Sequence, residues 1–162
     1  MTYILMGVSG SGKTSVGILL AKSLSIPFYD ADDYHNCSSI QKMKKGVALN
    51  DSDRIPWLKL LSSKIIDWNL KGDSVLACSA LKEKYRNLLS KNNKVAFIFL
   101  DGSYDLIYER LAKRKNHFFR KKMLEEQFTI LEKPIDCITI PINQSVENIC
   151  LMISSNLKKQ NK

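Results

Sequence analysis

The chain has 162 residues, of which 44% are hydrophobic and 25% are charged, so it suits one globular domain and is neither disordered nor fibrous. The formal net charge of +9 favours anionic ligands, which include nucleic acid, a membrane surface and polyphosphates. No stretch approaches the roughly 18 apolar residues of a membrane helix, and no signal peptide is expected at the N-terminus. The four cysteines lack Cys-x-x-Cys spacing, which argues against a zinc site and favours reduced thiols in a cytoplasmic protein.

Short apolar runs alternate with amphipathic stretches along the whole chain. Each run is rich in β-branched and aromatic residues, is too short for a helix, and predicts a buried strand. The predicted strands cover residues 3–6, 27–29, 75–78, 95–100 and 138–140. Helices are expected at residues 14–24, 53–70, 82–89, 104–113, 121–131 and 146–157. This alternation predicts an α/β fold with a parallel sheet covered by helices, and residues 1–162 form one domain because no linker or repeat divides them.

The first predicted strand leads into a glycine-rich phosphate-binding motif at the start of a helix. The motif reads Gly7-Val8-Ser9-Gly10-Ser11-Gly12-Lys13-Thr14. Glycines let the backbone wrap closely enough for several N–H groups to bind a polyphosphate, and the positive end of the helix adds to this. We expect Lys13 to reach the β- and γ-phosphates of ATP and the Thr14 hydroxyl to coordinate Mg²⁺. The alternative, a flexible glycine turn, does not account for this position between a strand and a helix.

Acidic residues that could bind Mg²⁺ or activate the acceptor hydroxyl follow the second predicted strand. The third strand holds no acid, whereas Asp30, Asp32 and Asp33 come directly after the second. Asp30 and Asp32 would face the same side of an extended segment because they are two residues apart. If that strand neighbours the first, Asp30 is placed to hold Mg²⁺ through water and Asp32 to orient or deprotonate an acceptor hydroxyl. A solvated acidic turn is the alternative.

Several further segments carry the signature of a known family. The most specific are Leu49-Asn50-Asp51 with Asp53-Arg54, and Ala77-Cys78-Ser79-Ala80-Leu81-Lys82. Other matching residues are Asp30, Asp32, His35, Lys42-Met43, Gly46, Pro56-Trp57-Leu58, Tyr85-Arg86, Arg110-Leu111, Arg114, His117-Phe118-Phe119, Gln127-Phe128, Leu131-Glu132 and Pro134. Over residues 3 to about 134 the chain therefore resembles the gluconokinases, small P-loop kinases related to shikimate and adenylate kinases. Departures from the family pattern stand at Ala31, Asn36, Ser39 and Asp101.

This resemblance implies a P-loop kinase fold with a five-stranded parallel sheet between helices. It also implies a helical substrate-binding insert at about residues 38–70 and a lid at about residues 110–122. The reaction would move the γ-phosphoryl group of ATP to the 6-hydroxyl of D-gluconate. The transition state spreads negative charge over the phosphoryl oxygens, which the permanently charged lid residues Arg110 and Arg114 are suited to neutralise. The resemblance also suggests a homodimer.

Two arginines are candidates for the carboxylate of gluconate. A planar carboxylate is best bound by a bidentate guanidinium group, and Arg54 and Arg86 match the family pattern. A surface salt bridge is the alternative for each. His35 is a candidate hydrogen-bond partner of the polyol, and a structural histidine beside a turn is equally consistent with the sequence. Trp57 and Trp68, at helical spacing with apolar residues, are expected in the core.

Other readings of the sequence remain open. Another small-molecule kinase of the same fold could act on shikimate, although Ser79-Ala80-Leu81 stands where shikimate kinases carry a glycine triplet, or on a nucleoside monophosphate. A basic nucleic-acid-binding module is the alternative from a different class. It would need exposed aromatics among basic residues, and only Phe118-Phe119 beside Arg120 fits. We therefore expect a small-molecule substrate and neither nucleic acid nor a membrane as partner.

Overall fold

The protein is built on a parallel sheet of five strands in the order β2-β3-β1-β4-β5. The structure, a computed structural model, describes residues 1–113 and 117–160, and the side chains of residues 1–113 and 121–159. The strands are β1 (Thr2–Met6), β2 (Phe28–Asp30), β3 (Ser74–Ala77), β4 (Val95–Asp101) and β5 (Ile138–Pro141). The predicted five-stranded parallel sheet is therefore confirmed.

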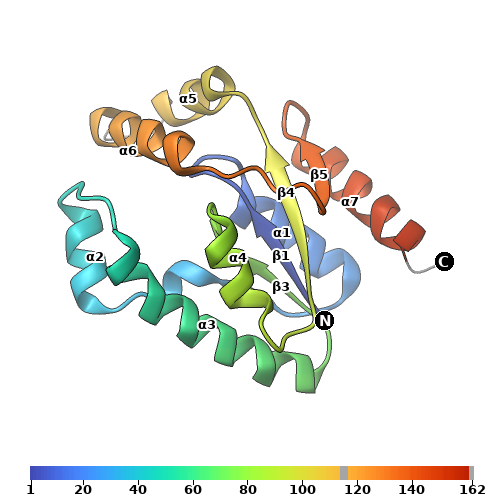
Figure 1. Ribbon diagram of the computed structural model, residues 1–162. Helices are drawn as coiled ribbons and strands as arrows, with labels where there is room; N and C mark the ends of the chain where they lie inside the picture. Colours follow the sequence, from blue (N-terminus) through green and yellow to red (C-terminus); the bar gives the residue numbers. More distant parts are fainter. Residues whose placement is uncertain (114–116, 161–162) are drawn as a thin grey trace.

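Helices cover both faces of this sheet (Figure 1). They are α1 (Lys13–Leu24), α2 (Cys37–Lys44), α3 (Asp51–Lys71), α4 (Glu83–Ser90), α5 (Tyr104–Ala112), α6 (His117–Ile130) and α7 (Val146–Gln160), with the short 3₁₀ helix η1 (Ala31–Tyr34) after β2. None of the helices in the described ranges combines the length and the apolar character that crossing a membrane requires.

The core consists of two apolar clusters, one on each face of the sheet. Successive strand residues point to opposite faces, so Leu5 and Ile98 join the cluster that includes α1 and α7. Ile4 and Phe99 join the other cluster, which includes α3 and α4. Because both of their faces are covered, the central strands β1, β3 and β4 are mostly apolar along their length, whereas the edge strand β5 alternates buried and exposed residues.

Helix α3 is fixed at its start by a reciprocal cap. The side chain of Asn50 accepts from the backbone N–H of Asp53 at 2.9 Å, and the Asp53 side chain accepts from the backbone N–H of Asn50 at 3.1 Å. These bonds satisfy two donors that a helix start leaves free. The helix consequently begins at Asp51, two residues before the predicted start, and carries Arg54 in its first turn.

Candidate active site

A cavity of about 890 Å³ opens where the P-loop meets the ends of β2 and β3. Ligands of open parallel sheets bind at this edge, beyond the carboxyl ends of the strands. Its walls come from the P-loop, the end of β2, the loop between α2 and α3, the first turns of α3, the residues after β3, and α6. The cavity therefore joins segments that are distant in sequence, from Ser9 to Ile130.

The P-loop depends on its glycines for its shape. Gly7, Gly10 and Gly12 have φ angles of 145°, 84° and 98°, which side-chain-bearing residues rarely adopt. The Lys13 ammonium group curls back and donates to the carbonyls of Gly7 and Val8, each at 3.0 Å. Burial lowers the pKa of Lys13, while the nearby carboxylates of Asp32 and Asp30 act in the opposite direction. Its amine is thus held at the loop that should receive phosphate.

Asp30 and Asp32 both line the cavity, but not by the geometry expected from the sequence. The prediction of one extended segment is wrong, because Asp32 lies in η1, where its backbone N–H donates to the Asp30 side chain at 3.1 Å. The other oxygen of Asp30 accepts from the Thr14 hydroxyl at 2.9 Å. The 3₁₀ turn therefore brings the two carboxylates to one end of the cavity with different neighbours.

The carboxyl group of Asp32 titrates above its usual range. Partial desolvation by the neighbouring protein and the negative charge of Asp30 both raise the pKa of Asp32, although 83% of its side chain is exposed. His35 and Lys13 oppose this shift without cancelling it. A carboxylate with a raised pKa has a greater affinity for a proton, which suits a group that receives one from a hydroxyl.

His35 forms part of the cavity wall and is packed against a tryptophan. Its ring stacks on Trp57 with centroids 4.2 Å apart, and its side chain is only 4% exposed. Burial lowers the pKa of His35. Its Nδ1 atom is buried without a hydrogen-bond partner among the described residues, and Nε2 lies 3.7 Å from Asp32. Trp57 is in the core, as predicted, but it also lines the cavity, a role that apolar periodicity did not reveal.

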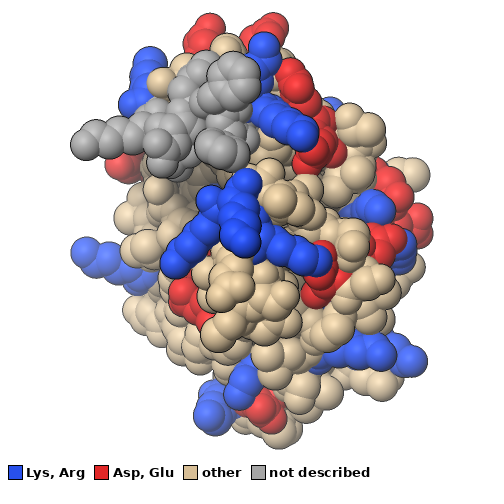
Figure 2. Space-filling model, turned by 90° about the vertical axis from the view of Figure 1, so that its left-hand side faces the viewer, with Lys and Arg blue, Asp and Glu red and all other residues tan. Residues whose placement is uncertain are grey.

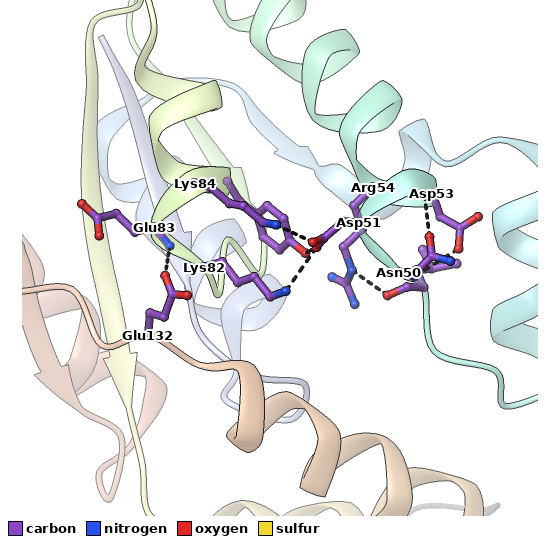
Figure 3. Close-up of polar contacts among 10 residues, drawn as sticks. Asn50, Asp51, Asp53, Arg54, Lys82, Glu83, Lys84 and Glu132 are labelled. Atoms are coloured by element: carbon purple, nitrogen blue, oxygen red, sulfur yellow. Dashed lines mark hydrogen bonds and ion pairs between the residues drawn. The ribbon is translucent and has the colours of Figure 1, made fainter.

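Arg54 lines the cavity without an ion-pair partner in the described part of the chain. Figure 3 shows the carboxylate of Asp51 in contact with Lys82 and Lys84 instead of Arg54. Asp53 pairs with Lys42 at 2.6 Å, and Asp51 accepts from Lys82 and Lys84. The Arg54 Nε atom donates to the carbonyl of residue 49 at 3.0 Å. Neither Asp51 nor Asp53 therefore neutralises the charge of Arg54. The surface salt bridge that the sequence allowed as an alternative is not formed with either residue.

Asp51 binds a third donor, the hydroxyl of Tyr85. The ring of Tyr85 also lies below the Arg54 guanidinium group, 5.8 Å from its central carbon. Such a cation over an aromatic ring is attracted by the ring electrons. Asp51 and Tyr85 therefore connect the first turn of α3 to α4 at the point where Arg54 enters the cavity.

Arg86 is not among the residues that line the cavity, and its contact with the gluconate carboxylate stays a prediction. Its side chain is buried on the inner face of α4, and Nη1 donates to the carbonyls of Ala80 at 3.1 Å and Leu81 at 3.2 Å. Ala80 has a φ angle of 44°, a left-handed conformation that is costly for a residue with a side chain. Arg86 therefore stabilises this turn through its side chain.

The predicted lid is described only in part. Arg110 lies on α5, where its guanidinium group donates to the carbonyl of Ile142 after β5, and it is not among the residues that line the cavity. Arg114 lies outside the described residues. Helix α6 contributes Met123, Glu126, Gln127 and Ile130 to the cavity wall. The sequence had not identified any of these as site residues, because neither charge nor spacing distinguishes them.

Comparisons with known proteins agree with this geometry. The model of the family described as shikimate kinase matches residues 9–134. The chain is 42% identical to a probable gluconokinase of Mus musculus over 177 residues, which covers 96% of each chain. It is 41% identical to the thermosensitive gluconokinase of Escherichia coli (strain K12) over 154 residues, which covers 91% of this chain and 82% of the relative.

Solved structures show the same similarity in three dimensions. A gluconokinase from Sinorhizobium meliloti 1021 matches with a TM-score of 0.84 and 33% identity, covering 99% of this chain and 97% of the other. A shikimate kinase from Aquifex aeolicus matches with a TM-score of 0.59 at 19% identity, covering 99% of this chain and 98% of the other, which shows a shared fold alone.

Proposed function

Since the chain belongs to the gluconokinases, we propose that it transfers the γ-phosphoryl group of ATP to the 6-hydroxyl of D-gluconate, giving 6-phospho-D-gluconate and ADP. One observation carries the assignment of the site: a single cavity is lined by a P-loop and by an arginine that no described carboxylate neutralises. A cavity with these two features suits one anionic nucleotide and one anionic acceptor.

Each proposed role follows from the chemistry of the residue. The P-loop amides and Lys13 bind the phosphates of ATP. Arg54 binds the carboxylate of gluconate at the far end of the acceptor, and His35, which lines the same cavity, hydrogen-bonds its hydroxyl groups. Asp32 takes the proton of the 6-hydroxyl as that oxygen attacks the γ-phosphorus. Positioning and charge neutralisation then provide most of the rate enhancement.

Mg²⁺ would enter this site together with the nucleotide. In the described part of the chain, no cluster of three or more His, Cys, Asp or Glu side chains could bind a metal ion. Thr14 at the start of α1 and Asp30 at the end of β2 have side-chain oxygens 2.9 Å apart; Thr14 would bind the ion directly and Asp30 through water, which fits an ion that takes its remaining ligands from phosphate and water. When bound, such an ion would neutralise charge on the phosphates.

A coupled assay of ADP release with several acceptors tests the proposal. The acceptors are gluconate, other aldonates, shikimate and AMP, each supplied with ATP and Mg²⁺. We expect gluconate to give the highest kcat/KM, because Arg54 selects a carboxylate and a linear polyol fits beside His35. Turnover of shikimate or AMP at a higher kcat/KM than gluconate would overturn the assignment. The homodimer expected from the family resemblance is a separate proposal, which sedimentation of the purified protein tests.

A further inference from the structure

Gln127 connects α6 to the P-loop across 118 residues of sequence. The backbone N–H of Ser9 donates to the side-chain oxygen of Gln127 at 2.6 Å. A backbone N–H has no acceptor capacity, so the carboxamide oxygen must face the loop and the NH₂ group must point elsewhere. The orientation of this side chain is therefore fixed by its partner.

The NH₂ group of Gln127 has no hydrogen-bond acceptor among the described residues, and the side chain lines the cavity. The same cavity is lined by Ser9, Lys13 and Asp32, the groups that surround the reacting end of ATP in the proposed function. A carboxamide offers two N–H donors and no charge. Gln127 thus presents donors at the phosphate end of the cavity from a side chain that is already anchored.

We propose that Gln127 is a further catalytic residue, which donates a hydrogen bond from its NH₂ group to the phosphoryl group in transfer. In that step the 6-hydroxyl oxygen forms a bond to the γ-phosphorus while the bond to the oxygen that bridges the β- and γ-phosphates breaks. ADP leaves with the electron pair of that bond, and the hydroxyl proton passes to Asp32. No proton moves to or from Gln127. Its contribution is to stabilise charge on the phosphoryl oxygens.

The competing explanation is that Gln127 only anchors α6 to the P-loop. Two substitutions separate these roles because they differ in what they keep. Gln127→Glu retains an oxygen acceptor for Ser9 but replaces the NH₂ group by a second carboxylate oxygen, so that both donors are lost and a negative charge is added. Gln127→Met keeps the length of the side chain and removes both the acceptor and the donor.

We expect Gln127→Glu to lower kcat about 100-fold, the scale of losing one charge-stabilising donor, with a thermal midpoint close to the wild type. Gln127→Met should lower both kcat and the thermal midpoint. Gln41→Glu on α2 is the matched control, because it adds the same charge at an exposed residue that does not line the cavity; its kcat should be unchanged. If Gln127→Glu keeps wild-type kcat, or if its thermal midpoint falls as far as that of Gln127→Met, the catalytic role is wrong.

A binding experiment tests the same contact without any acceptor. The proposal rests on the proposed function for the identity of the acceptor, but not for the contact with the γ-phosphoryl group. Gln127→Glu should weaken binding of a non-hydrolysable ATP analogue at least tenfold more than binding of ADP, as calorimetry can measure. Equal weakening of both nucleotides would refute the contact, whereas failure of gluconate as a substrate would refute the proposed function alone.

Discussion

At the scale of single residues, Arg54 is the most direct test of substrate class. Arg54→Lys keeps the charge but removes the forked pair of donors that matches a carboxylate. We expect KM for gluconate to rise at least tenfold, equivalent to about 1.4 kcal/mol, with little change in KM for ATP. Steady-state kinetics with each substrate varied in turn gives both values.

A neutral polyol without the carboxylate provides the control for Arg54. The wild type should phosphorylate it poorly, and Arg54→Lys should lower that rate little further. The reason is that a polyol without a carboxylate makes no bidentate contact with Arg54. A lower thermal midpoint with an unchanged KM for gluconate would instead show that Arg54 serves the structure.

The two carboxylates beside the P-loop predict how the rate depends on pH. Asp32 accepts a proton only when ionised, so kcat should fall as the pH drops through its raised pKa. Asp30→Asn removes a negative charge that raises this pKa, and the acidic limb should therefore move to lower pH. Rates from roughly pH 4 to pH 8 at saturating Mg²⁺ measure the shift. An acidic limb that stays in place in Asp30→Asn would mean that another group controls it.

At the scale of helices and strands, Asp51 determines how α3 is held against α4. Lys84, Tyr85 and Lys82 all donate to its carboxylate and hold its pKa below the usual range (Figure 3). A depressed pKa in the folded state adds stability above the unfolded pKa of about 3.9 and loses it as the pH falls through the folded value. The thermal midpoint of Asp51→Asn should therefore lie below that of the wild type at neutral pH. The difference should shrink in acid, and an equal difference at both pH values would exclude this linkage.

Glu132, which follows the end of α6, caps the start of helix α4. The N-cap residue of α4, Lys82, makes no side-chain cap, and the free N–H of Glu83 donates instead to the carboxylate of Glu132 at 2.5 Å. The backbone N–H of Glu132 also donates to the carbonyl of Leu81 at 2.9 Å. A negative group at a helix start is favourable because it meets the positive end of the helix dipole. Residues that follow α6 therefore fix the start of the helix that binds Asp51.

The strands and most helices could be predicted because their apolar residues repeat with a clear period. Helix α2 could not, because Ile40 and Met43 are its only large apolar residues. Its one local signal is the Asn36 side chain, which accepts from the backbone N–H of Ser39 at 2.8 Å and caps the helix. Without an apolar face, such a cap is indistinguishable from a turn. The residues of η1 likewise lack an apolar periodicity, which explains why this segment was expected to be extended.

The site residues could be predicted where a sequence motif determines their chemistry. They could not be predicted where tertiary packing determines which side chains reach the cavity. The P-loop can be identified directly from its sequence motif. The buried position of Arg86 was not predictable, because charged residues usually lie on exposed surfaces, whereas here the guanidinium group donates to two backbone carbonyls. Gln127 was not identified as a site residue because it is uncharged and meets Ser9 only through the fold.

At the scale of the whole molecule, the net charge of +9 invites the question of nucleic-acid binding. Figure 2 shows basic side chains gathered at the centre of one face, with acidic side chains scattered around them. This mixed surface suits attraction of small anionic substrates more than a continuous contact with phosphate backbones. We expect no shift of labelled single- or double-stranded nucleic acid at physiological ionic strength. Binding that weakens steeply with added salt would contradict this expectation.

The strand order has a consequence for how the protein is made on the ribosome. β1 and the P-loop are synthesised before β3 and β4, the strands with which β1 pairs in the described part of the chain, at residues 74–77 and 95–101. A nascent chain that ends before β3 therefore has no partner for its first strand. The backbone N–H of Gly7 likewise donates to Ser79, beyond β3. β1 must therefore remain unpaired until β3, which ends at residue 77 of 162, has been synthesised, and during that interval chaperone binding and aggregation compete with folding.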